Sequence, residues 1–93
     1  MKKQKMYKIC KICGSTNIIE SHHVYGGTAN RKVSEANGFK VYLCYEHHRG
    51  TYGVHGKYGS ELKLKLQQET QEEYEKNHSR AEFMNIIGRN YLD

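Results

Sequence analysis

Two runs of branched and aromatic residues predict a pair of short strands in the first half of this 93-residue chain. The first run, Ile18–Tyr25, stops at the turn signal Gly26-Gly27. The second, Phe39–Leu43, alternates in polarity and leads directly into Cys44. We expect the two strands to pair antiparallel, which would place the segment that follows Cys44 back beside the first strand.

Helical patterns occupy three other segments. Asn30 is a suitable cap for a short helix over Arg31–Asn37, which would stop at Gly38. Ser60 is a suitable cap for a helix of about four turns. Residues spaced by four would share one face of that helix: Leu62, Leu66, Thr70 and Tyr74.

A last helix is predicted from the capping-box spacing of Ser79 and Glu82, and it would end at Gly88. Its apolar residues are Phe83, Met84, Ile86 and Ile87. Together these elements predict one small α+β domain over residues 1–93, with a core unit over 7–57 and a helical extension over 58–93.

Glycines interrupt the segment between Arg49 and Ser60, at positions 50, 53, 56 and 59. Such spacing is too flexible for a long helix and favours a loop folded closely around something. His55 lies inside this loop.

Two short clusters carry thiol and imidazole ligands: Cys10-x-x-Cys13 and Cys44-x-x-His47. Two such knuckles can close one tetrahedral structural zinc site, and the spacing favours His47 over His48 as the fourth ligand. The alternatives are free thiols or a redox-active Cys-x-x-Cys motif. Three cysteines fit a disulfide framework poorly, so we expect a reducing, cytoplasmic location.

Charge is unevenly distributed along the chain. Residues 1–57 hold ten Lys and Arg against three Glu, whereas residues 58–93 hold five against seven acidic groups. A basic half that also carries the metal ligands suits a polyanion such as DNA, although a solvated surface has the same composition. No apolar run long enough to span a bilayer or to serve as a signal is present, so no membrane partner is expected.

The remaining histidines predict a second centre. His22 and His23 lie near a strand end and face opposite sides, and His48 directly follows the expected zinc ligand. A cation on His22 and His48 could stabilise a phosphorane-like transition state while His23 takes a proton from water, which amounts to phosphodiester hydrolysis. The alternative is a pair of exposed polar residues.

At this point residues 10–57 resemble the HNH, or ββα-metal, nucleases, and in particular their zinc-stapled branch. The resemblance implies a His-Me finger fold in which His22 and His48 bind the catalytic ion and His23 is the general base. The run Cys44–Gly50 also looks like small phage HNH proteins similar to the RecA-dependent recombination-associated nucleases.

The chain departs from that family in two places. Asn37 is the nearest candidate for the middle Asn of the pattern, and the glycines after His48 leave His55 as a candidate third ligand. An all-His site is softer than an Asp-His site, so we expect Mn²⁺, Ni²⁺ or Zn²⁺ to occupy it as the catalytic divalent cation as readily as Mg²⁺.

We therefore expect a metal-dependent DNA endonuclease of phage or prophage origin. Side chains expected to hold the phosphate backbone are Arg31, Lys32, Arg49 and Lys57, and Tyr25 or Tyr52 could stack on a sugar or base. The alternatives are a non-catalytic zinc module that binds nucleic acid, or an adaptor that docks its acidic helices on phage recombination or packaging proteins.

Overall fold

A two-stranded antiparallel hairpin forms the centre of the computed structural model, which describes residues 8–92. Strand β1 is Ile19–His23 and strand β2 is Lys40–Cys44, and the register pairs Ile19 with Cys44 and His23 with Lys40. The predicted pairing is confirmed, but β1 ends two residues earlier than expected. Val24 and Tyr25 leave the strand because both side chains turn into the core, where they are fully buried.

Helix α1, Thr28–Asn37, connects the two strands and begins earlier than predicted. Its N-cap is Gly27, whose carbonyl already accepts a hydrogen bond from the backbone N–H of Arg31 at 2.8 Å, so the proposed cap at Asn30 is wrong. The predicted end of the helix is confirmed. Gly38 follows it with φ of 72°, a left-handed conformation that glycine adopts without steric cost.

Helix α3, Ser60–Tyr74, starts one residue after its cap, which is Gly59 and not Ser60 as expected. Its buried face also differs from the predicted stripe, because Gln67 and Gln71 are buried beside Leu66. The two glutamines are buried because they have hydrogen-bond partners. The Gln67 side-chain amide donates to the Val24 carbonyl at 3.4 Å, and the Gln71 side chain accepts from the Tyr91 N–H at 2.8 Å.

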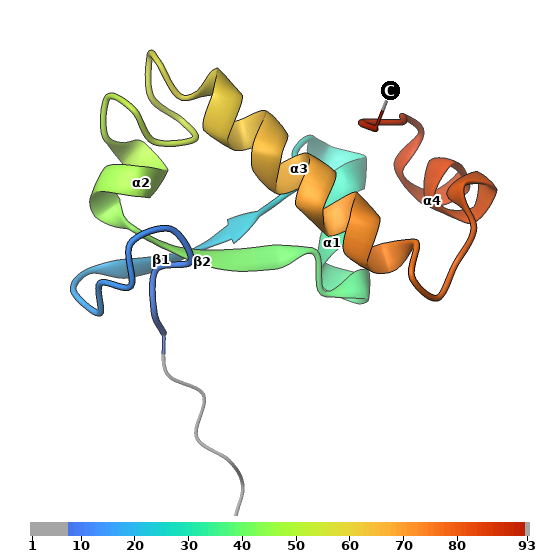
Figure 1. Cartoon of the computed structure of the whole chain (residues 1–93), viewed down its shortest axis with the longest axis horizontal. Coiled ribbons are helices and arrows are strands. Elements are labelled where there is room, and N and C mark those ends of the chain that lie inside the picture. The colour runs from blue at the N-terminus through green and yellow to red at the C-terminus, as the bar shows by residue number, and fades with distance from the viewer. Residues whose placement is uncertain (1–7, 93) are drawn as a thin grey trace, which may run out of the picture.

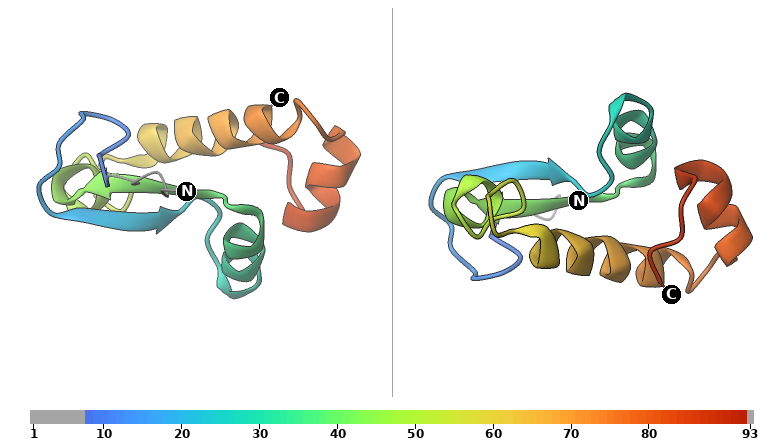
Figure 2. Two further views of the ribbon diagram at one scale, coloured as in Figure 1. Left: turned by 90° about the horizontal axis from the view of Figure 1, so that it is seen from below. Right: turned by 90° about the horizontal axis from the view of Figure 1, so that it is seen from above.

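Helix α4, Arg80–Ile87, carries the capping box predicted from the sequence. The Glu82 N–H donates to the Ser79 hydroxyl, and the Glu82 carboxylate accepts from the Ser79 N–H. Figure 2 shows α3 on one side of the hairpin and α1 on the other. Helix α4 lies at the end remote from the turn that carries Cys10 and Cys13, here called the cysteine turn.

Two apolar clusters hold these elements together. The first packs β2 against α3 next to the cysteine turn and consists of Cys10, Leu43, Cys44, Val54 and Leu66. The second joins the strand ends to α4 and consists of Val24, Tyr25, Phe39, Phe83 and Ile87. Because Tyr25 is a fully buried member of this cluster, the prediction that it could stack on a nucleotide is wrong.

The described part of the chain is thus a small α+β unit with a two-stranded sheet and four helices (Figure 1). None of those helices is long and apolar enough to cross a membrane.

Candidate metal centres

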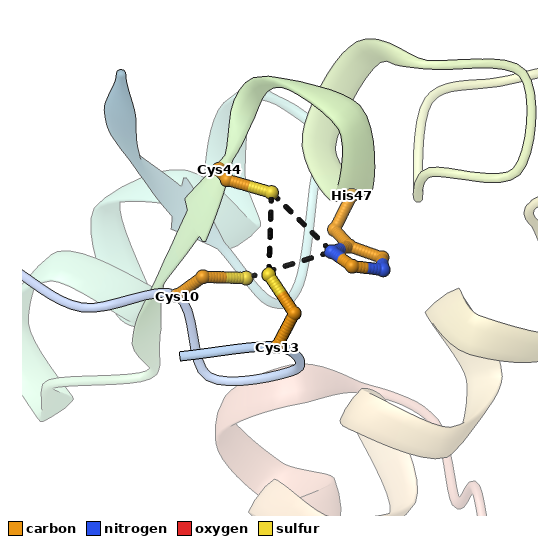
Figure 3. Close-up of side chains that lie close together, drawn as sticks. All are labelled: Cys10, Cys13, Cys44 and His47. Carbon is orange, nitrogen blue, oxygen red and sulfur yellow. Dashed lines mark hydrogen bonds between the residues drawn. The ribbon is translucent and has the colours of Figure 1, made fainter. Parts of the chain in front are cut away.

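Three cysteines and one histidine converge at one end of the hairpin (Figure 3). Cys10 and Cys13 lie on the turn before β1, Cys44 ends β2, and His47 lies in the short helix α2, Tyr45–Arg49. The Lys11 N–H donates to the Tyr42 carbonyl at 2.9 Å, which fastens the cysteine turn to β2. All four ligand atoms lie within 4.8 Å of one another.

Three of the six distances between these atoms agree with the edges of a tetrahedron around a metal ion. Zinc bonds of about 2.3 Å to sulfur and about 2.0 Å to nitrogen give S–S edges of about 3.8 Å and S–N edges of about 3.5 Å. Here Cys13 Sγ lies 3.8 Å from Cys44 Sγ, and His47 Nδ1 lies 3.6 Å from Cys10 Sγ and 3.3 Å from Cys44 Sγ. This cluster, the Cys3His site, could therefore hold a metal ion such as zinc.

The electrostatics of the thiols also suit a cation. Burial raises the pKa of Cys10, but the backbone N–H groups of Cys44, Cys13 and Ile12 outweigh it, and the net pKa falls to about 6. A backbone hydrogen bond at Ser15 lowers the pKa of Cys13, yet burial and the neighbouring thiols raise it overall. Cys10 therefore loses its proton more readily than Cys13, because two neighbouring thiolates would repel each other. A divalent cation between them would remove that repulsion.

A second group, the histidine trio, consists of His22, His48 and His55 (Figure 1 locates their elements, β1, α2 and the loop after α2). Their ring nitrogens also lie within 4.8 Å of one another. The ring centroid of His22 lies 5.2 Å from that of His48 and 5.2 Å from that of His55. The His48 and His55 centroids are 4.8 Å apart. His22 and His48 are buried, whereas His55 is exposed.

The glycine-rich loop brings His55 to this place by packing its own backbone on α2. The N–H groups of Val54 and His55 donate to the carbonyls of His47 and His48 at 2.9 and 3.0 Å. A Cβ atom at Gly56 would lie 1.9 Å from the Gly50 carbonyl oxygen, so no other residue fits this turn without a backbone shift. The prediction of a tightly folded loop in place of a long helix is confirmed. The loop packs against its own backbone and that of α2.

Two members of the trio, His22 and His55, have pKa values below the usual value for histidine. Loss of hydration, followed by the neighbouring His48 and His55, lowers the pKa of His22 to about 4. His55 is exposed overall, but partial loss of hydration at its ring lowers its pKa, with His48 as the second cause. Neutral imidazole has a free lone pair, so these rings are ready to bind a cation at neutral pH.

Glu20 orients His48, a role that the sequence analysis did not assign. His48 Nδ1 lies 2.6 Å from Glu20 Oε1, and the same oxygen accepts from Arg49 Nε at 3.0 Å. These contacts lower the pKa of Glu20, the bond to His48 first and Arg49 after it. With Nδ1 engaged, Nε2 is the ring atom left to face the trio. Glu20 and His22 lie two residues apart on a strand and so share a face. This spacing was the sequence signal that could have placed Glu20 beside the trio.

His23 lies beside the trio in a cavity of about 440 Å³. The residues lining this cavity include His22, His23, His48, His55 and Arg31. His22 is buried and His23 is partly exposed, but both line this cavity, although the sequence analysis expected them to face opposite sides of the strand.

Glu35 of α1 holds His23 in place. Its Oε1 lies 3.0 Å from His23 Nε2, and its Oε2 accepts from Lys40 Nζ at 2.9 Å. The bond to His23, followed by that to Lys40, lowers the pKa of Glu35. Since Glu35 occupies Nε2, Nδ1 is the nitrogen of His23 that remains available.

The expected backbone-binding residues have different surroundings. Arg31 lines the cavity, and Lys32 is exposed on the same helix. Arg49 is paired with Glu20, and Lys57 lies over the Tyr58 ring. Asn37 does not approach the trio: its side-chain amide donates to the Val33 carbonyl within α1 at 2.9 Å, and it lines a different cavity.

Comparisons of this chain with protein-family models, with curated proteins and with solved structures found no match.

Proposed function

We propose that this protein is a metal-dependent DNA endonuclease of the HNH, or ββα-metal, type. The observation that carries the proposal is that the histidine trio and His23 line one cavity, which Arg31 also lines. A cation site, a general base and a phosphate-binding guanidinium are the three groups that phosphodiester hydrolysis requires. The order β1, β2, α2, with ligands on β1 and α2, is the arrangement expected of that fold.

In this proposal the Cys3His site binds a structural zinc. Its four protein ligands complete a tetrahedron, so no position is left for water or substrate. Its part is to fasten the cysteine turn to the start of α2, and thereby to set the position of His48 next to His47. A chain of this size has a thin core, and such a metal would supply part of its folding free energy.

The trio would hold the catalytic ion through His22, His48 and His55. When bound, that divalent cation supplies positive charge to the scissile phosphate and to the departing 3′-oxygen. Nitrogen ligands favour manganese, nickel or zinc at least as much as magnesium. Glu20 keeps the His48 ring turned so that Nε2 faces the trio.

His23 is the proposed general base. Its Nδ1 accepts a proton from a water molecule, and the hydroxide attacks phosphorus while the bond to the 3′-oxygen breaks. The departing 3′-oxygen takes a proton from solvent water, which leaves 5′-phosphate and 3′-hydroxyl ends. Glu35 lies against the opposite ring nitrogen at 3.0 Å. Its carboxylate orients the ring and stabilises the imidazolium that forms.

Substrate binding would rest on the basic half of the chain. Arg31 lies in the cavity, and the other proposed contacts to the phosphate backbone are Lys32, Arg49 and Lys57. These side chains would position DNA without reading its sequence.

A plasmid-nicking assay over magnesium, manganese, nickel and zinc tests this function. The His22→Ala protein should lose nicking with every ion, whereas His78→Ala should retain it, because His78 lies outside the cavity, where it stacks on Tyr74. DNA binding without nicking by the wild-type protein in all four ions would instead identify a non-catalytic nucleic-acid-binding module. Absence of both would favour an adaptor.

A further inference from the structure

Two exposed tyrosines form a stacked pair on the loop after α2, at the end of the molecule opposite α4 (Figure 1). Tyr52 is 71 % exposed and Tyr58 is 57 % exposed, and their ring centroids lie 5.4 Å apart with planes inclined by 29°. Large aromatic side chains usually cover a core or an interface. Outward-facing rings of this kind therefore point to a ligand with a flat apolar face.

The pair stands on a rigid base. The Tyr58 N–H donates to the Thr51 carbonyl at 2.8 Å, which closes the loop between the two rings. A Cβ atom at Gly59 would lie 1.6 Å from the Gly53 carbonyl oxygen, so the chain segments that carry the tyrosines are in direct backbone contact. A platform fixed in this way loses little conformational entropy when a ligand binds.

The same loop supplies a member of the histidine trio. His55 lies between the two tyrosines in sequence, and its N–H bonds to the His48 carbonyl. The position of the pair is thus tied to the proposed catalytic cavity through α2.

Positive charge accompanies the rings. Lys57 Nζ lies 5.4 Å from the centroid of the Tyr58 ring. Arg49, which is 58 % exposed and paired with Glu20, precedes the same loop in the chain. Aromatic faces beside cationic side chains match the chemistry of a nucleotide, whose base stacks while its phosphate pairs with the cation.

We propose that Tyr52 and Tyr58 form a stacking platform for an unpaired base, and that the substrate is single-stranded or locally unpaired DNA. The proposal rests on the nuclease function above and names its substrate class. In duplex DNA each base face is covered by its neighbours, so only an unpaired base can lie on the tyrosine ring. Loss of one base–aromatic stack typically weakens binding by roughly fivefold to a hundredfold.

Binding measurements with the full-length, zinc-loaded chain test the platform. Fluorescence anisotropy would compare a labelled single strand with a duplex of the same sequence, with His23→Ala present in every protein to prevent cleavage. Tyr52→Ala should weaken single-strand binding at least fivefold and duplex binding less than twofold, while Tyr52→Phe should restore it. Tyr45→Ala is the matched control, since Tyr45 is 51 % exposed and is not part of the pair.

Equal loss for both DNA forms, or no loss for either, would overturn the platform and leave two tyrosines that stack only on each other. Retained zinc content shows that each variant is folded. The nuclease proposal is judged separately by plasmid nicking with an intact His23. A protein that does not cut DNA can still show the stacking effect, and a nuclease can lack it.

Discussion

The bond from Glu20 to His48 offers a sharp test of the proposed second metal centre, because Glu20 would affect ion binding only through the orientation of the His48 ring. The His48 ring is buried and its Nδ1 lies 2.6 Å from the carboxylate oxygen, a short charge-assisted contact. In Glu20→Ala the ring would lose this anchor and be free to rotate Nε2 away from the trio. Outer-shell partners of this kind typically change metal affinity by about 10- to 100-fold.

We expect Glu20→Ala to weaken manganese binding at the trio by about 10- to 100-fold, and Glu20→Gln by less, because the amide oxygen can still accept from Nδ1. Isothermal titration of zinc-loaded protein with manganese measures the affinity directly. Glu46→Ala is the matched control, since Glu46 is exposed on the same helix. Zinc content should be unchanged in all three variants. Unaltered manganese affinity in Glu20→Ala would refute the assigned role.

Three further predictions concern pH, the loop and backbone strain. Unfolded His22 takes up a proton near pH 6.5, but the folded ring does so only near pH 4. The free energy of unfolding should therefore fall as pH drops through this window, by at most about 3 kcal/mol. Urea unfolding at pH 7 and pH 4.5 should show a smaller fall for His22→Asn than for the wild type. Gly56→Ala should displace the loop and abolish ion binding at the trio, whereas Gly26→Ala, whose Cβ would meet open space, should not, as calorimetric metal titration would reveal. Ile18 is 63 % exposed and has φ of 51°, so Ile18→Asn should raise the free energy of unfolding by about 1 kcal/mol in urea titrations; a decrease would mean that the side chain contributes more than the strain costs.

Spacing along the chain was enough to predict which Cys and His side chains converge and the two strands beside them. Cys-x-x-Cys and Cys-x-x-His pairs confine two ligand atoms to one turn, so their meeting requires only that the two turns be close. The capping box at Ser79 and the end of α1 at Gly38 are local signals of the same kind, since each depends on atoms within one helical turn.

Contacts between distant segments could not be predicted in this way. Glu20 and Glu35 resemble ordinary surface acids in the sequence, and only the packing of α2 and α1 on the hairpin brings them to His48 and His23. Gln71 is polar, so the periodic pattern did not assign it to the core. Its burial depends on hydrogen bonds with Asn90 and Tyr91, which follow α4 in the chain. Tyr25 was misassigned to the surface because amphipathic rings suit either environment.

The central claim, that His23 activates water for attack on DNA, is tested most directly by single-turnover cleavage with saturating manganese. General-base catalysis contributes about 10²- to 10⁴-fold, so His23→Ala should cut at least about 100-fold more slowly than the wild type while binding manganese and zinc normally. Equal cleavage rates for the two proteins would contradict the account.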